Sequence, residues 1–235
     1  SSADYLGHSD GTLPGSLEDL RVAWAEGGRA KDVWRVDDRV AGASLRPMKG
    51  HRPQIKICGI RTAAFAAEAE RLGADYLGLI FAKGSLRQVT VSCAREIVAG
   101  LSGRAKVVGV FTDAAPADCR EIAREVGFGI VQLHRRATED DVRELHRAGL
   151  EVWTLAGGAP GDAVLFDSSH GDGETDLRFG SWKTVLAGGI STANLGAALS
   201  SGADIIDASG SLETAPGVKS IPKLVDFMMR ARSIS

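Results

Sequence analysis

From residue 54 to the C-terminus, short apolar runs alternate with stretches of helical periodicity. The apolar runs are continuous rather than alternating, as is typical of strands that are covered on both faces of a parallel sheet. The strand-like runs occupy residues 54–60, 74–81, 105–111, 129–134, 151–156, 163–168, 183–189 and 203–208. A chain with eight evenly spaced strands of this kind is restricted to very few α/β folds.

Helical patterns separate most of these strands. They cover residues 62–73, 91–101, 116–127, 138–148, 192–201 and 219–231. Pro116 suits the first turn of a helix, and Gly127 stands where that helix should end. Residues 157–162 and 169–182 are too short or too glycine-rich for a helix. We therefore predict a (β/α)8 TIM barrel with an incomplete helical ring, and a doubly wound sheet is the alternative.

Residues 1–52 differ in composition from the repeating region. The first sixteen are rich in Gly, Ser, Asp and Pro, which is typical of irregular chain. We predict an N-terminal extension over residues 1–52, partly disordered or packed on the barrel, and a catalytic barrel domain over residues 53–235. A partner-binding segment is the alternative interpretation of the extension.

Composition limits the partners and the compartment. A formal net charge of −2 gives no electrostatic reason to bind nucleic acid or an anionic membrane. The three cysteines, Cys58, Cys93 and Cys119, have unrelated spacings and indicate neither a disulfide framework nor a zinc site. No apolar run could span a bilayer, and the N-terminus lacks the pattern of a signal peptide. We expect a cytoplasmic protein without a metal site.

Chemistry in parallel α/β barrels lies just past the carboxyl ends of the strands. Cys58 ends the first strand, and Lys56 has the same side-chain parity, so its charge would favour the thiolate. Asp167 ends a buried strand, where a carboxylate is unusual unless it is paired or functional. A small buried cysteine and a turn-capping carboxylate are the structural alternatives.

Three further polar residues follow other strands. Arg87 comes after the second strand, His134 ends the fourth, and Asp207 ends the eighth. A solvated loop charge and a hydrogen-bonded rim residue are the structural alternatives for Arg87 and His134. With Cys58 and Asp167, these residues would bring together the groups needed for acid–base chemistry on a small molecule.

The last two strand–helix loops have the character of an anion site. Barrels often bind phosphate with the loops after strands seven and eight and a helix N-terminus. Glycines let backbone N–H groups approach an anion closely, although tight turns alone could also require them. The candidate residues are Gly188, Gly189, Ser209, Gly210 and Ser211.

Residues 54–232 resemble the phosphoribosylanthranilate isomerases, the barrel enzymes of tryptophan biosynthesis. The resemblance lies in KICGI at 56–60, Ser85-Leu86-Arg87, VGVF at 108–111, VQLH at 131–134, LFDS at 165–168, LAGGI at 186–190 and the stretch from Asp207 to Lys219. The KICG and QLH motifs together are specific. The resemblance covers the predicted barrel and none of residues 1–53.

The resemblance implies an Amadori rearrangement of N-(5-phosphoribosyl)anthranilate to an aminoketose, without a cofactor. It implies that Cys58 is the general base and that Asp167 is the general acid. Arg87 would engage the anthranilate carboxylate, His134 and Asp207 would position the substrate, and the two loops would hold its phosphate. We expect the chain to act on this phosphorylated small molecule as a monomer or homodimer.

Several positions depart from the family pattern, and two segments among them bear on function. Arg135-Arg136-Ala137 follow VQLH, and two carboxylates stand at 173–176 where the family carries glycines. They leave open a diverged isomerase for another aminosugar phosphate, or an inactive binding or scaffold paralogue. A scaffold would have no need of Cys58, Asp167, Arg87 and Asp207 together. The related isomerase of histidine biosynthesis is disfavoured, because we would expect an Asp in place of Cys58.

Overall fold

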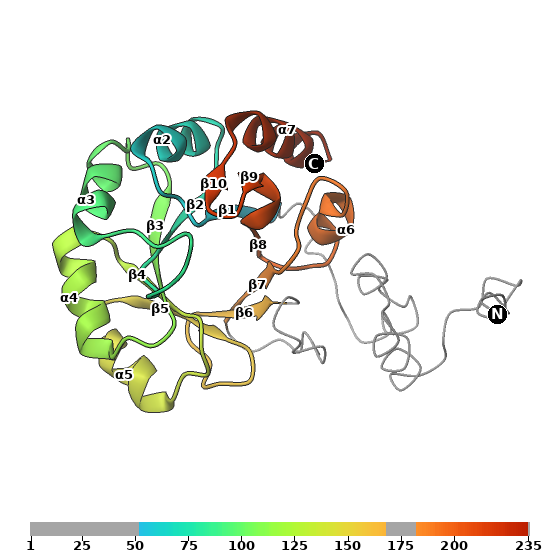
Figure 1. The fold of residues 1–235 in the computed structure, drawn as a ribbon. Helices are drawn as coiled ribbons and strands as arrows, with labels where there is room; N and C mark the ends of the chain where they lie inside the picture. Colours follow the sequence, from blue (N-terminus) through green and yellow to red (C-terminus); the bar gives the residue numbers. More distant parts are fainter. Residues whose placement is uncertain (1–51, 168–181, 235) are drawn as a thin grey trace, which may run out of the picture. The chain divides into compact units, whose positions relative to one another are not determined.

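The computed structural model of the protein describes residues 52–167 and 182–234. In these ranges eight parallel strands pair in chain order, and β8 returns to pair with β1, so the sheet closes (Figure 1). The strands are β1 (Gln54–Cys58), β2 (Tyr76–Ile80), β3 (Lys106–Phe111), β4 (Ile130–Leu133), β5 (Glu151–Leu155), β6 (Ala163–Asp167), β7 (Lys183–Ala187) and β8 (Ile205–Ala208). Closure confirms the predicted TIM barrel and excludes the doubly wound sheet.

The helices lie outside the ring of strands (Figure 1). They are α2 (Ala63–Arg71), α3 (Val91–Ala99), α4 (Pro116–Val126), α5 (Glu139–Arg147), α6 (Leu195–Leu199) and α7 (Ile221–Ser233). The 3₁₀ helix η4 (Gly210–Leu212) and the hairpin of β9 (Glu213–Ala215) and β10 (Val218–Lys219) lie between β8 and α7.

The helical ring is incomplete where the sequence indicates. Residues 156–162 join β5 to β6 without a helix. The second predicted gap, 169–182, and the predicted extension, 1–52, lie outside the described residues except for Trp182 and Arg52. None of the described helices has the length and apolar character needed to cross a membrane.

Local signals explain most helix boundaries. The side chains of Thr62, Thr90 and Thr138 each accept a hydrogen bond from the backbone N–H three residues on, as N-caps do. Helix α6 is shorter than the predicted 192–201 because the Asn194 side chain closes a turn instead. Its Oδ1 accepts a hydrogen bond of 2.8 Å from the Ser191 N–H.

Carboxylates organise the amino-terminal end of the barrel. Asp75, Asp162 and Asp204 each stand directly before an even-numbered strand, β2, β6 or β8. Each accepts the backbone N–H of the second residue of the preceding strand, at 2.7–2.8 Å. These bonds satisfy donors that would otherwise remain unpaired at the strand starts.

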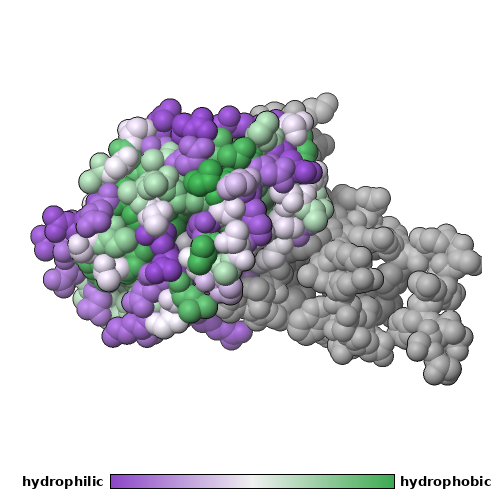
Figure 2. Space-filling view, turned by 45° about the horizontal axis from the view of Figure 1, so that its top comes forward, coloured by the Kyte–Doolittle hydropathy of each residue, from purple (hydrophilic) through white to green (hydrophobic). Residues whose placement is uncertain are grey.

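Apolar side chains fill the barrel interior. Tyr76 and Trp153 are almost fully buried and meet edge to face, with ring centroids 4.9 Å apart. In the view of Figure 2, hydrophilic residues cover the outer margin of the barrel, and hydrophobic residues gather nearer the middle of the face. The barrel interior is therefore a packed core, and the site must lie at one end of it.

Candidate active site

A buried ion pair lies in the barrel interior between the first and last strands. Lys56 on β1 is fully buried, and its register partner on β8 is Asp207. Lys56 Nζ donates a hydrogen bond of 2.5 Å to Asp207 Oδ2. Burial alone would lower the pKa of Lys56, but the charges of Asp207 and Cys58 outweigh it and raise that pKa. Lys56 therefore stays an ammonium ion.

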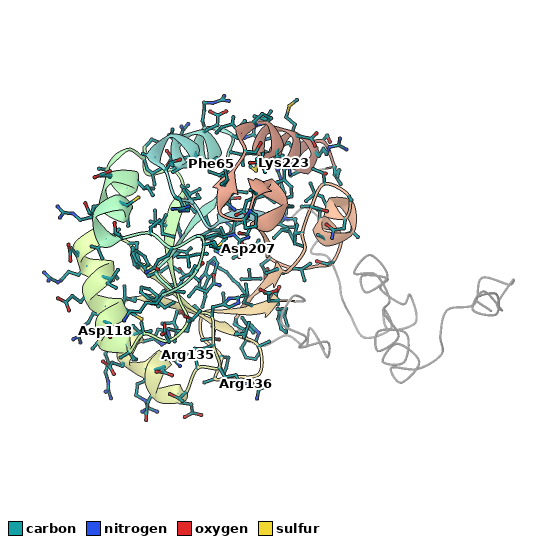
Figure 3. All side chains as sticks on the ribbon, viewed as in Figure 1. Phe65, Asp118, Arg135, Arg136, Asp207 and Lys223 are labelled. Atoms are coloured by element: carbon teal, nitrogen blue, oxygen red, sulfur yellow. The ribbon has the colours of Figure 1, made fainter. Side chains whose placement is uncertain are left out.

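Asp207 retains one unused acceptor. Its Oδ1 is buried and has no hydrogen-bond partner among the described residues. Orphaned buried carboxylate oxygens are costly unless a ligand satisfies them. Figure 3 shows Asp207 near the centre of the ring of strands, where a bound molecule at the barrel mouth would meet it.

Cys58 ends β1, two residues beyond Lys56, and is 7% exposed. Its register partner is Gly78 on β2, where an added Cβ would lie 2.7 Å from Cys58 Sγ. Burial raises the pKa of the Cys58 thiol, against the opposing pull of Lys56 and Lys219. The expected effect of Lys56 on the thiolate is thus present, and desolvation outweighs it.

Asp167 and His134 lie together on another side of the mouth. Asp167 ends β6 and His134 follows β4, and 3.6 Å separates Asp167 Oδ2 from His134 Nε2. The amide of Gln132 holds the other ring nitrogen of His134 at 3.2 Å. The charge of Asp167 also acts on Asp207. The fold therefore brings a second carboxylate and an imidazole to the same end of the barrel as Cys58.

Arg87 reaches toward the mouth from the loop after β2. Its side chain packs against Gly59, where an added Cβ would lie 2.6 Å from Arg87 Cδ. Its Nε and Nη2 donate to the two carboxylate oxygens of Glu213 at 2.7 and 2.8 Å. Because Gly59 directly follows Cys58, this contact places the arginine side chain beside the end of β1 that carries the thiol.

The loop after β8 is tied to the end of β1. Lys219 Nζ donates to the carbonyl of Ser209 at 2.9 Å and to Glu213 Oε1 at 3.0 Å. The Ser209 hydroxyl in turn donates to the carbonyl of Cys58 at 3.1 Å. An added Cβ on Gly210 would lie 3.5 Å from Arg87 Nη2, so this loop and the guanidinium are neighbours.

The two predicted anion loops occupy the same end of the barrel. Gly188 and Gly189 follow β7 with φ of 86° and 63°, a left-handed conformation that favours glycine. The Ser211 hydroxyl after β8 is buried without a partner among the described residues. Backbone N–H groups and a hydroxyl are the donors that an anion needs.

The arginines that depart from the family pattern lie away from this centre. Figure 3 shows Arg135 close to α5 and Arg136 at the loop after β5, both far from Asp207 in that view. Arg135 donates to both oxygens of Asp141 at 2.7 and 2.9 Å, and Asp141 also belongs to the capping box of α5. The charge of Arg135 is therefore neutralised locally. The other departure, 173–176, lies outside the described residues.

Sequence reasoning did not single out Glu213 or Lys219 as members of the site. Both lie in the last family motif, yet their partners are Arg87, which is 126 positions away from Glu213, and Ser209. No local pattern announces a pair so distant in sequence. The one sequence signal is that Glu213 is flanked by small and apolar residues. This indicates a buried and therefore paired carboxylate, but it does not predict which residue the partner is.

Comparison with known proteins gives a consistent result. A family model described as "N-(5'phosphoribosyl)anthranilate (PRA) isomerase" matches residues 55–230. The N-(5'-phosphoribosyl)anthranilate isomerase of Neisseria meningitidis serogroup B is 35% identical over 204 residues, which cover 77% of this chain and 97% of that protein.

Solved structures agree with the sequence comparison. The phosphoribosyl anthranilate isomerase of Thermus thermophilus has a TM-score of 0.69 and 30% identity, covering 77% of this chain and all of that one. Monomers generated from the dimeric Thermotoga maritima enzyme have a TM-score of 0.67 and 26% identity, with coverage of 77% and 98%.

Proposed function

Since the chain belongs to the N-(5'-phosphoribosyl)anthranilate isomerase family, we propose how its own residues perform that isomerisation in tryptophan biosynthesis. The substrate carries an aryl carboxylate, a furanose ring and a phosphate, and each part has a matching group at the barrel mouth. The observation that carries the proposal is the meeting of Cys58, the Lys56–Asp207 pair and Asp167 at one end of the barrel.

Asp167 acts as general acid in the first step. It donates its proton to the furanose ring oxygen while the bond from that oxygen to C1 breaks. The lone pair of the anthranilate nitrogen forms the C1=N bond of an iminium ion. His134, at 3.6 Å from the Asp167 carboxylate, orients this group.

Cys58 acts as general base in the second step. Its thiolate removes the proton from C2, and the C–H electron pair moves to form an enol as the iminium nitrogen is neutralised. The enol then loses its O–H proton and gains a proton at C1, which gives the ketone of the product. The positive charges of Lys56 and Lys219 favour the thiolate. Asp207 Oδ1, which has no partner among the described residues, accepts a hydrogen bond from a hydroxyl group of the sugar.

The two glycine- and serine-containing loops bind the phosphate through their backbone N–H groups. Their residues are Gly188, Gly189, Ser209, Gly210 and Ser211. The relative from Thermotoga maritima is described as dimeric and was also obtained as monomers, so we propose that this protein acts as a monomer or a homodimer.

The decay of fluorescence of freshly generated phosphoribosylanthranilate tests this mechanism. Cys58→Ala and Asp167→Asn should each lower kcat by roughly 10²–10⁴-fold, the range of general acid–base catalysis. Cys119→Ala is the matched control, because this second buried cysteine lies on α4, outside the site. Wild-type turnover by either active-site variant would exclude that residue. If folded wild-type protein leaves this substrate unchanged, the better interpretation is a diverged isomerase that acts on another aminosugar phosphate.

The pH dependence tests the state of the thiol. Because burial raises the pKa of Cys58, the thiolate is the minor form near neutral pH, and its fraction grows as pH rises. The rate at which iodoacetamide alkylates Cys58 in the free enzyme should therefore increase about tenfold per pH unit through the neutral range, whereas kcat/KM also depends on the proton that Asp167 must hold. An alkylation rate that is flat from pH 6 to 8 would contradict a protonated Cys58 in the free enzyme.

We also propose that residues 53–235 form the complete catalytic unit. The family model matches only residues 55–230, so the extension has no counterpart in the matched region. Deletion of residues 1–48 should leave kcat and KM within twofold of the full chain. Loss of folded protein on deletion, measured by circular dichroism, would show instead that the extension covers part of the core.

A further inference from the structure

Glu213 is the most highly coordinated carboxylate at the barrel mouth, and the acid–base mechanism does not use it. Its residue is 7% exposed. Its Oε1 accepts from Arg87 Nε and Lys219 Nζ, and its Oε2 accepts from Arg87 Nη2 and the Gly217 N–H. Burial would raise the pKa of Glu213, but these donors outweigh it and lower that pKa to about 2. Glu213 is therefore charged, and four hydrogen bonds fix its position.

The way Glu213 binds Arg87 leaves one edge of the guanidinium available. A guanidinium can offer two adjacent N–H groups along its Nε–Nη2 edge or along its Nη1–Nη2 edge. Glu213 takes the first edge. No described residue accepts a hydrogen bond from Nη1, and the Arg87 side chain keeps 31% of its surface exposed.

The residues that contact Arg87 fix the orientation of this second edge. Gly59, next to Cys58, lies under the aliphatic part of the side chain, and Gly210 lies beside Nη2. A Cβ added to Gly59 would occupy the space that the arginine needs, whereas one added to Gly210 would lie in ordinary van der Waals contact with Arg87 Nη2. The guanidinium is thus held against the end of β1 that carries the thiol and against the loop after β8.

We propose that Glu213, locked by Lys219, is a positioning residue that presents the Nη1–Nη2 edge of Arg87 to the aryl carboxylate of the substrate. This inference rests on the proposed function and deepens it, because it assigns to Glu213 the discrimination between substrates with and without that carboxylate. An arginine that is already ordered loses less conformational entropy when it binds.

Binding of two inhibitors tests the inference. One is the reduced product analogue that carries the ortho-carboxyphenylamino group, and the other is the same molecule with an unsubstituted phenylamino group. Wild type should prefer the carboxylated analogue by about 10–100-fold, the usual range for paired charged hydrogen bonds. Glu213→Gln should reduce this preference about tenfold and leave the affinity for the phenylamino analogue unchanged. It should likewise raise KM more than it lowers kcat.

Two further variants separate positioning from a structural role. Glu68→Gln is the matched control, because Glu68 forms the same two-bond pair with Arg71 on the exposed surface of α2. It should leave the preference at the wild-type value. The preference for the carboxylated analogue should be no smaller in the double variant Arg87→Met/Glu213→Gln than in Arg87→Met alone, because Glu213 acts through Arg87.

The outcomes distinguish this inference from the proposed function. Equal loss of affinity for both analogues in Glu213→Gln would overturn the positioning role while the isomerase activity of wild type stands. Wild-type protein that neither converts phosphoribosylanthranilate nor binds either analogue would overturn both. If Glu213→Gln fails to fold by circular dichroism, Arg87→Lys replaces it, because an ammonium group lacks the second planar edge. A wild-type preference in Arg87→Lys would then overturn the proposal.

Discussion

The two ends of the barrel use carboxylates in different ways. At the amino-terminal end, Asp75, Asp162 and Asp204 accept backbone N–H groups of neighbouring strands. At the carboxyl-terminal end, Asp207 and Glu213 are met by the side chains of lysine and arginine. Backbone donors hold a carboxylate in one fixed arrangement, whereas side-chain cations have further N–H groups to offer a ligand.

The difference separates stability from function within one fold. The carboxylates at the amino-terminal end complete the hydrogen bonding of the barrel and leave little for a substrate. Those at the mouth leave Asp207 Oδ1 and one edge of Arg87 unused among the described residues. Barrel enzymes in general place chemistry at the carboxyl ends of their strands. Changes at the two ends should therefore have separable effects.

The largest effect is expected for Lys56→Met. It leaves Asp207 as an uncompensated buried charge, which should lower the free energy of unfolding by about 3–5 kcal/mol. Urea denaturation measures this change. Lys56→Met/Asp207→Leu should recover most of the stability and none of the turnover, because the pair lies in the site. Full turnover by the double variant would place the pair outside the mechanism.

Glu70→Gln should be destabilising without affecting catalysis. Glu70 accepts the backbone N–H groups of Ser102, Arg104 and Ala105, which lead into β3 at the amino-terminal end. The loss of these charged bonds should cost about 1.5–3 kcal/mol in urea denaturation at pH 7. A reduced kcat/KM in the folded variant would break the separation between the two ends.

The pH dependence of this effect has a defined sign. Backbone donors lower the pKa of Glu70 to about 2, against the opposing effect of burial. In the unfolded chain a glutamate titrates at about 4.3. The stabilisation is present above that value and is lost as pH falls toward 2. The stability difference between wild type and Glu70→Gln should therefore shrink as pH falls below about 5.

Arg135→Met should have the smallest effect, although Arg135 follows β4 at the carboxyl-terminal end of the barrel. Its pair with Asp141 is partly exposed and lies beside α5, so its loss should cost less than about 1 kcal/mol. KM should stay within twofold of wild type in the fluorescence assay. A clear rise in KM would show that the loop after β4 reaches the substrate.

Local patterns in the sequence predicted the framework well. Each predicted strand is present with its ends shifted by at most a few residues, because a continuous apolar run marks a buried parallel strand wherever it pairs. The start of α2 follows from the side-chain cap of Thr62, and the start of α4 follows from Pro116, which suits the first turn of a helix. The placement of Cys58 and Asp167 at strand ends follows from the same register.

Closure of the barrel decided what those residues meet. It paired Lys56 with Asp207 across 151 positions and Arg87 with Glu213 across 126. Closure also decided the direction of the pKa shift of Cys58. Side-chain parity along β1 predicts the neighbouring Lys56, but the burial of the thiol depends on all the strands that surround it. Spacing along a chain predicts backbone hydrogen bonds and side-chain parity. The distances that set charge, burial and free hydrogen-bonding groups exist only once the first and last strands are joined.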